Sequence, residues 1–189
     1  MNFEEIEKEV KNVLGEKRFK HSCGVAKRAE ELAIIYGEDC KKAKLIGIAH
    51  DIAKELPQEE AIKYAKENGI IFDEIEQKEQ ALWHCKIGAD MAVKRFGFTQ
   101  DMKQAIIHHT TGNINMTTLD KIIYIADKTE ENRTYDGINE AIKISNENLD
   151  DGILFCAKRA ISYSLKKNSL IHPDTISLIN KIIMNKNNQ

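Results

Sequence analysis

Apolar residues recur at spacings of three and four along almost the whole chain, with polar residues between them. This is the period of an amphipathic α-helix, which packs one face inward and leaves the other in water. No segment alternates apolar and polar residues as a half-buried strand does, so we predict an all-α fold. The pattern predicts helices over residues 2–14, 18–36, 39–53, 57–68, 79–96, 99–109, 116–130, 137–146, 149–167 and 173–185.

Helix boundaries are marked by a small number of glycines, prolines and capping residues. Four glycines stand where a helix should stop: Gly37, Gly69, Gly97 and Gly112. Pro57 and Pro173 fit the first turn of a helix, where a missing N–H costs nothing. Three residues carry the side-chain oxygen that N-caps require and precede apolar periods: Thr99, Thr117 and Asp150.

Composition narrows the class of protein. At 189 residues the chain can form one domain, over residues 1–189, with its own core. Its 28 Lys and Arg against 30 Asp and Glu leave no overall basic field for nucleic acid. Four single cysteines at 23, 40, 85 and 156 indicate reduced thiols, and no apolar run reaches the roughly 20 residues of a membrane span. We expect a cytoplasmic protein that binds neither nucleic acid nor a membrane.

The informative ionisable residues fall on apolar helix faces. His21 is followed one turn later by Val25, and His50 and Asp127 each come four residues after an isoleucine. Asp51 directly follows His50. Because a buried unpaired carboxylate is very costly, these residues need a strong partner. One divalent cation with two imidazole and two carboxylate ligands would satisfy all four side chains.

A structural interpretation competes with the metal site. A single histidine on an apolar face is more often a hydrogen-bonded core residue, and a single buried aspartate is more often paired with arginine or caps a helix. Four such residues together require several coincidences, so the metal site is favoured. Adjacent helical residues diverge by about 100°, so His50 and Asp51 can share a metal only at the flank of their helix.

Further histidines and basic residues extend the candidate site. His84, His108 and His109 could complete a second metal site, protonate a leaving group or hold a phosphate, although each could also simply end a helix. Arg18, Lys54 and Arg133 stand near the ligand candidates in sequence and could hold phosphate oxygens, or could be solvated surface charges. His172 begins a predicted helix, whose free N–H groups favour anions.

The order of these residues resembles that of a known enzyme superfamily. A histidine, a His-Asp pair about thirty residues later and a distant aspartate on a helix resemble the HD superfamily of metal-dependent phosphohydrolases. Six segments are similar to the YqeK family, bacterial HD-domain enzymes that split diadenosine tetraphosphate into two ADP. They are KRFKHSCGVAKRAEELA, AKLIGIAHDIAKEL, WHCKIGA, AIIHHTTG, MTTLDKIIYIADKTEENR and LIHPDTISLIN.

The resemblance implies an HD core at about residues 18–130 with additional C-terminal helices. It implies iron or a similar metal held by His21, His50, Asp51 and Asp127. It implies nucleotide contacts at Arg18, Lys54, His84, His109, Arg133, Leu170, Ile171, His172, Pro173, Asp174 and Thr175. Catalytic roles are expected for Asp51, His84, His108 and His109, and in two-metal relatives Asp51 would bridge the ions. Glu131 replaces the family's usual proline, which bears on the placement of Arg133.

The mechanistic hypothesis is that a metal-activated water attacks phosphorus at the centre of the tetraphosphate. Imidazole and carboxylate ligands suit iron, manganese, cobalt or zinc, as one or two ions. Two alternatives stay open: an HD phosphohydrolase acting on a nucleoside monophosphate, a deoxynucleoside triphosphate or a cyclic dinucleotide, and a nucleotide-binding sensor without turnover. Exposed apolar residues on the extra helices would support a homodimer.

Overall fold

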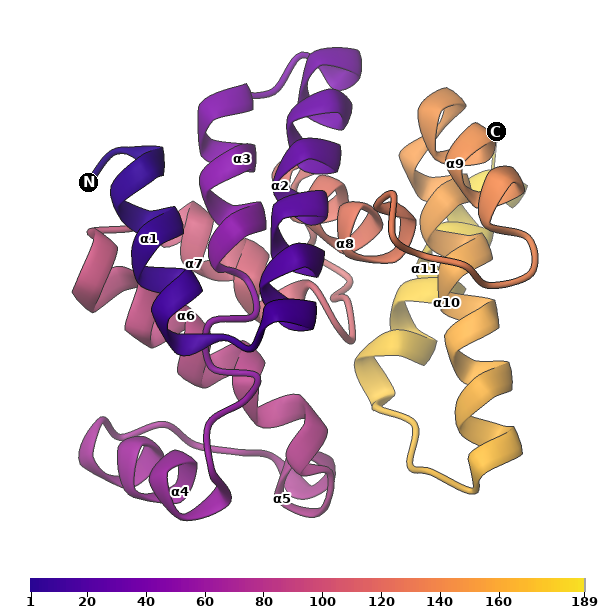
Figure 1. Ribbon diagram of the computed structural model, residues 1–189. Coiled ribbons are helices and arrows are strands. Elements are labelled where there is room, and N and C mark those ends of the chain that lie inside the picture. Colours follow the sequence, from indigo (N-terminus) through magenta and orange to yellow (C-terminus); the bar gives the residue numbers. More distant parts are fainter. Residues whose placement is uncertain (189) are drawn as a thin grey trace.

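A computed structural model describes residues 1–188, which form α-helices joined by turns and contain no strand (Figure 1). The predicted all-α class is therefore confirmed for this part of the chain. The helices are α1 (Phe3–Val13), α2 (Glu16–Tyr36), α3 (Cys40–Ala49), α4 (Gln58–Glu67), α5 (Glu74–Lys78), the 3-10 helix η1 (Gln80–Leu82), α6 (Trp83–Phe96), α7 (Gln100–His108), α8 (Thr118–Thr129), α9 (Ile138–Glu147), α10 (Leu149–Lys167) and α11 (Pro173–Asn187).

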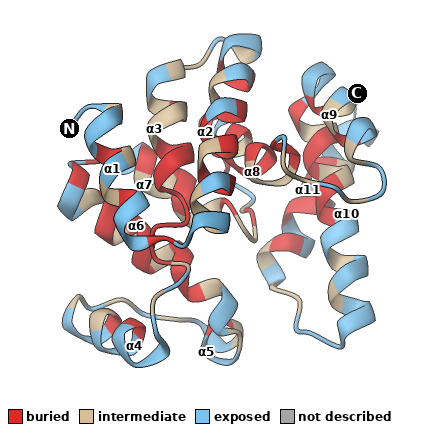
Figure 2. Cartoon of the chain, in the orientation of Figure 1, coloured by how far each residue is buried: buried red, intermediate tan, exposed pale blue. Residues whose placement is uncertain are grey.

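Helix α8 lies at the centre of the arrangement. On one side it packs against α2, α3 and α7, and on the other against α10, which also carries α9 and α11 (Figure 1). Buried residues gather on the facing sides of these helices, while α4 and α5 are mostly exposed (Figure 2). Five consecutive residues of α8, Ile122–Ala126, are fully buried. Burial of its apolar residues is the main force that holds the two groups of helices together.

Most predicted helix boundaries lie within a few residues of the observed ones, and the end of α3 and the presence of α5 are the main differences. The helix predicted over 39–53 ends at Ala49, because His50 Nδ1 lies 2.7 Å from the Gly47 carbonyl oxygen that a longer helix would use for its next backbone bond. Residues 51–55 continue as tight turns instead. The sequence pattern also missed α5, which is only five residues long and begins with a capping box between Asp73 and Glu76.

Most predicted end signals lie where expected. All four glycines have positive φ: Gly37, Gly69, Gly97 and Gly112. Thr117 caps α8 through a bond from the Asp120 N–H, whereas Thr99 has N-cap backbone angles but no side-chain cap. The prediction for Asp150 is wrong: Asn148 caps α10, and Asp150 pairs with Lys121 at 2.6 Å. Pro173 occupies the first turn of α11, while Pro57 stands one position earlier, at the N-cap of α4.

Two further features concern the predicted reduced thiols and the possibility of a membrane-spanning helix. All four cysteines are free thiols, so no disulfide contributes to stability in the described part of the chain. Within residues 1–188, no helix is both long enough and apolar enough to cross a membrane.

Gly47 allows α3 to approach α2 closely. A Cβ at this position would lie 2.6 Å from Ala26 Cα and 2.8 Å from Ala26 N, both backbone atoms that cannot rotate away. The same residue supplies the carbonyl oxygen that orients His50. The contact between the two helices therefore sets the position of a candidate metal ligand.

We predict that Gly47→Ala destabilises the protein by about 1–3 kcal/mol, because the added methyl forces α2 and α3 apart. Urea unfolding measures the change. Gly88→Ala is the matched control: its Cβ meets neighbours at 3.5–3.6 Å, and alanine favours a helix interior by up to about 1 kcal/mol over glycine. Equal stability of Gly47→Ala and the wild type would contradict the close approach.

Candidate active site and metal centre

Four side chains predicted as metal ligands meet where α2, α3 and α8 converge. His21 Nε2 lies 3.1 Å from Asp127 Oδ1 and 3.8 Å from Asp51 Oδ2. His50 Nε2 lies 3.5 Å from Asp51 Oδ2 and 3.9 Å from Asp127 Oδ1. Helix α3 ends at Ala49, and the turn that follows directs both His50 and Asp51 toward the same point.

The two histidines are oriented as metal ligands are. His50 Nδ1 bonds to the Gly47 carbonyl oxygen, and His21 Nδ1 lies 3.1 Å from Glu130 Oε1. Such contacts place the ring proton on Nδ1 and leave the Nε2 lone pair free for a cation. Both Nε2 atoms are buried and make no hydrogen bond. The donor atoms of His21, His50 and Asp127 lie within 4.8 Å of one another, so these residues fit a divalent metal ion.

The second oxygen of Asp51 faces another pair of imidazoles. Asp51 Oδ1 lies 3.2 Å from His84 Nε2 on α6 and 3.6 Å from His109 Nε2, which follows α7. The two Nε2 atoms are 3.1 Å apart, and His109 Nδ1 bonds to the Ile106 carbonyl oxygen at 2.6 Å. Asp51 therefore presents one oxygen to each pair of histidines, an arrangement in which a carboxylate can bridge two cations.

Both carboxylates stay ionised despite their surroundings. Burial alone would raise the pKa of Asp51, but His50, His109 and His84 hold it well below its ordinary value. Burial would likewise raise the pKa of Asp127, and the charge of Lys128 with the bond to His21 lowers it further than burial raises it. Two negative charges are therefore held at the convergence of the helices.

The imidazoles differ in charge. Burial lowers the pKa of His50, which is fully enclosed. For His21, burial lowers the pKa, but the nearby carboxylates of Asp127 and Glu130 outweigh it and raise the pKa. Burial also opposes the charge on His84 and His109, while Cys85 and Asp51 raise both pKa values, that of His109 to about 10. His21, His84 and His109 therefore hold a proton more strongly than an ordinary histidine, and His50 holds one less strongly.

The basic residues predicted from sequence adjoin the cluster. Arg18 NH1 donates to Asp51 Oδ2 at 2.9 Å, and Arg133 donates to Asp127 Oδ1 at 2.7 Å and to its carbonyl oxygen at 2.8 Å. Both side chains are about one third exposed, so part of each guanidinium still faces solvent. Lys54 Nζ lies 3.2 Å from His84 Nδ1. These three cations are placed to meet an anionic group that approaches the carboxylates.

Glu131 does not displace Arg133. It lies on the surface and pairs with Lys27 at 2.6 Å, while α8 ends one residue earlier in an extended Glu130. The chain then turns through a bond from the Arg133 N–H to the Glu130 carbonyl oxygen. Arg133 thus reaches Asp127 without the proline that the resemblance led us to expect.

Two groups of predicted residues lie outside the cluster. The structure does not bring His108 to it: its Nδ1 lies 3.0 Å from Asp120 Oδ2, at the first turn of α8. The Leu170–Thr175 segment joins α10 to α11 and contacts the loops around the site. His172 Nε2 lies 2.7 Å from Asp73 Oδ2, and Thr175 Oγ1 donates to the Thr111 carbonyl oxygen at 2.8 Å.

Sequence reasoning missed four residues that touch the cluster. Glu130 binds His21, and Lys128 Nζ lies 3.3 Å from Asp127 Oδ2 and donates to the His109 carbonyl oxygen. Cys85 Sγ lies 3.6 Å from His84 Nε2, and Thr110 Oγ1 lies 3.0 Å from His109 Nε2. Three of the four adjoin a predicted site residue in sequence, and this adjacency could have identified them as candidates.

Comparison with known proteins agrees with this geometry. The model of the HD domain matches residues 18–132, from α2 to just beyond α8. The symmetrical bis(5'-nucleosyl)-tetraphosphatase of Bacillus subtilis (strain 168) is 35% identical, over 97% of this chain and 98% of that protein. The protein of the same name from Halalkalibacterium halodurans is 35% identical, over 93% of this chain and 94% of its own length.

A solved structure shares the whole fold. The crystal structure of a predicted HD superfamily hydrolase involved in NAD metabolism, from Clostridium acetobutylicum, is 37% identical and superposes with a TM-score of 0.93. The match covers 98% of each chain, so it includes α9, α10 and α11 as well as the HD core. The clustered residues, the match to the family model and the similarity to these relatives over nearly the full length agree with one another. The chain belongs to the HD-domain family of hydrolases, together with the symmetrical bis(5'-nucleosyl)-tetraphosphatases.

Proposed function

We propose that this protein hydrolyses dinucleoside tetraphosphates symmetrically, converting diadenosine tetraphosphate and water into two molecules of ADP. The observation that carries the proposal is the similarity to two symmetrical tetraphosphatases over nearly the full length of the chain. The paired carboxylates and imidazoles beside three cationic side chains support it, because phosphoryl transfer needs a metal ion and groups that offset phosphate charge.

The metal would be held by His21, His50, Asp51 and Asp127, and we propose iron as the ion that the family resemblance implies. When bound, a divalent ion supplies Lewis-acid polarisation of a phosphoryl oxygen and lowers the pKa of water. Asp51 Oδ1, His84 and His109 offer donors for a second ion. Elemental analysis of protein purified without added metal would identify the ion and the number bound.

Arg18 and Arg133 would bind the phosphates on either side of the scissile bond. Each already donates to a ligand carboxylate and keeps N–H groups exposed, so each can bind a phosphoryl oxygen without leaving its place. Lys54, beside His84, would neutralise a further phosphate. Their fixed positive charges offset the negative charge of the tetraphosphate and orient its central bridge toward the carboxylates.

His84 and His109 are suited to protonate the departing group. With a single ion at the site, the pKa of His109, raised to about 10, keeps this imidazole charged near neutral pH, the pKa of His84 is raised as well, and both Nε2 atoms point toward Asp51. As the oxygen of water forms its bond to phosphorus, the central P–O bridge breaks, and the departing nucleoside diphosphate takes a proton or hydrogen bond from this pair. Cleavage of that bridge divides the tetraphosphate into equal halves.

Product analysis tests the position of cleavage. We expect the metal-loaded wild type to convert diadenosine tetraphosphate to ADP alone, and Asp51→Ala to show no conversion, because this substitution removes a carboxylate shared by all four imidazoles. Anion-exchange chromatography of the products measures both. ATP with AMP would contradict symmetrical cleavage, and absence of turnover would direct the search to other nucleotides or to a sensor.

The two adjacent histidines should differ in effect. We predict that His109→Asn lowers kcat by about 10²–10⁴-fold, because it removes a proton donor that faces Asp51. His108→Asn, which alters only the contact with Asp120, should change kcat severalfold at most. Steady-state kinetics with thermal unfolding of each variant separates loss of chemistry from loss of fold. A larger loss of kcat in His108→Asn than in His109→Asn would indicate that His108 is the catalytic histidine.

Metal binding should release protons. The raised pKa of His21 means that a metal must displace a proton from the metal-free site, so affinity should rise with pH and fall as the solution becomes acidic. Calorimetric titration of Mn²⁺ into chelator-treated protein, in two buffers of different ionisation enthalpy, counts the protons. Identical heats in the two buffers would contradict the protonated site. Asp127→Asn is the comparison variant and should weaken binding, because it removes a proposed ligand.

A further inference from the structure

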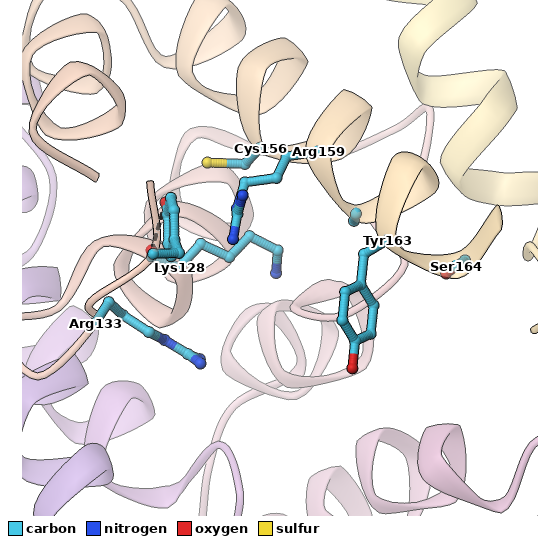
Figure 3. Close-up of a pocket in the computed structure, with 8 residues that line it drawn as sticks. Lys128, Arg133, Cys156, Arg159, Tyr163 and Ser164 are labelled. Carbon is cyan, nitrogen blue, oxygen red and sulfur yellow. Dashed lines mark hydrogen bonds between the residues drawn. The ribbon is translucent and has the colours of Figure 1, made fainter. Parts of the chain in front are cut away.

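A cavity of about 290 Å³ opens beside the metal centre, between the end of α8 and the inner face of α10. Figure 3 shows Lys128, Arg133, Arg159 and Tyr163 pointing toward the same open space. Tyr135, Cys156, Ala160 and Ser164 also line it. Neither Lys128, Arg159 nor Tyr163 is among the nucleotide contacts that the family resemblance implies.

The cavity begins at a proposed metal ligand. Lys128 Nζ lies 3.3 Å from Asp127 Oδ2, and Arg133 NH2 lies 2.7 Å from Asp127 Oδ1. A phosphate chain bound at the metal centre would therefore leave it past these two cations. The volume is near the lower end of the roughly 300–1,000 Å³ typical of small-molecule sites.

The charge of the cavity favours an anion. Its lining includes three cations and no carboxylate. Arg159 forms no ion pair with a carboxylate anywhere in residues 1–188; its guanidinium carbon lies 3.9 Å from the centre of the Tyr135 ring. This stacking fixes the plane of the guanidinium and leaves its N–H groups free to bind a phosphate.

An aromatic side chain lies at the outer end. Tyr163 follows Arg159 by one turn of α10, so both lie on the same face of that helix. It is 63% exposed, a large aromatic surface that the protein itself does not cover. Aromatic faces beside a cationic groove stack nucleobases. The lining thus combines two cations that contact Asp127 with a third cation and an exposed aromatic ring on α10, a set of groups that suits phosphates and a base.

Symmetrical cleavage requires two such subsites. If the central bridge lies at the metal centre, one nucleoside diphosphate must extend to each side of it. The implied contacts at Lys54, His84 and Leu170–Thr175 account for one half of the substrate. We propose that the cavity between α8 and α10 binds the other half, with Lys128, Arg133 and Arg159 on its phosphates and Tyr163 stacked on its base. This inference rests on the proposed function and identifies where its second nucleoside lies.

A competing location is the larger cavity near the start of α2, of about 720 Å³. It also reaches Arg133 and includes Lys17, Arg18 and the exposed Lys20, but three carboxylates line it as well: Glu55, Glu130 and Glu131. These carboxylates offset most of the positive charge of its four cations, whereas no carboxylate lines the cavity between α8 and α10, which is therefore the better site for phosphates. Lys20→Ala therefore serves as the control that alters a cation of the competing cavity.

The test compares two ligands that differ by one nucleoside. One is a diadenosine tetraphosphate analogue with a methylene group in place of the central bridging oxygen, and the other is adenosine 5'-tetraphosphate. Calorimetry on the Mn²⁺-loaded protein measures Kd for the wild type, Tyr163→Ala, Tyr163→Phe, Arg159→Gln and Lys20→Ala. The analogue is not cleaved at its central bridge, so this experiment measures binding alone. Hydrolysis of diadenosine tetraphosphate is measured separately, and the binding result can be interpreted whether or not hydrolysis is seen.

Tyr163→Ala should raise Kd for the two-nucleoside analogue by about 5- to 150-fold, the range expected for loss of one stacked base, and change Kd for adenosine 5'-tetraphosphate less than twofold. Tyr163→Phe should restore wild-type affinity. Arg159→Gln should raise Kd for both ligands, and Lys20→Ala should change Kd for neither. Wild-type affinity in Tyr163→Ala, equal losses for both ligands, or a greater loss in Lys20→Ala would each overturn the proposal.

Discussion

The structure depends on keeping two carboxylates, Asp51 and Asp127, ionised at a buried junction of helices. Desolvation opposes their charge, and the protein offsets it with imidazoles on one side and guanidinium groups on the other. A divalent cation would add positive charge between these carboxylates and the neighbouring imidazoles. Much of the local architecture follows from bringing opposite charges to this one place.

The end of α3 illustrates that dependence. Gly47 lets α3 approach α2, and its carbonyl oxygen holds the His50 ring, which ends the helix there. Asp51 then begins a tight turn and can present one oxygen to His21 and His50 and the other to the histidines of α6 and α7. A backbone feature that weakens the helix thus creates the geometry of the site.

The helices beyond the HD core contribute a different property. Helix α10 packs on α8 and presents Arg159 and Tyr163 to the cavity that Lys128 and Arg133 also line, and the connection to α11 contacts the loops on another side of the site. The core therefore supplies the reactive groups, while the C-terminal helices supply surfaces that can recognise a long, highly charged substrate. The solved relative shares both parts over 98% of its length.

The sequence by itself determined the helical class, nearly all helix positions and the four clustered side chains that we propose as metal ligands, because helical periodicity is local and a charged residue on an apolar stripe is conspicuous. It did not determine the end of α3 or the short α5, since both depend on side-chain bonds of single residues. Tertiary structure alone decided that His109 faces Asp51 while His108 turns to Asp120, since adjacent residues in a helical turn look the same in a pattern. It also brought Glu130 to His21 and Arg159 into one cavity with Lys128 and Arg133, because contacts between residues distant in the chain depend on how whole helices pack.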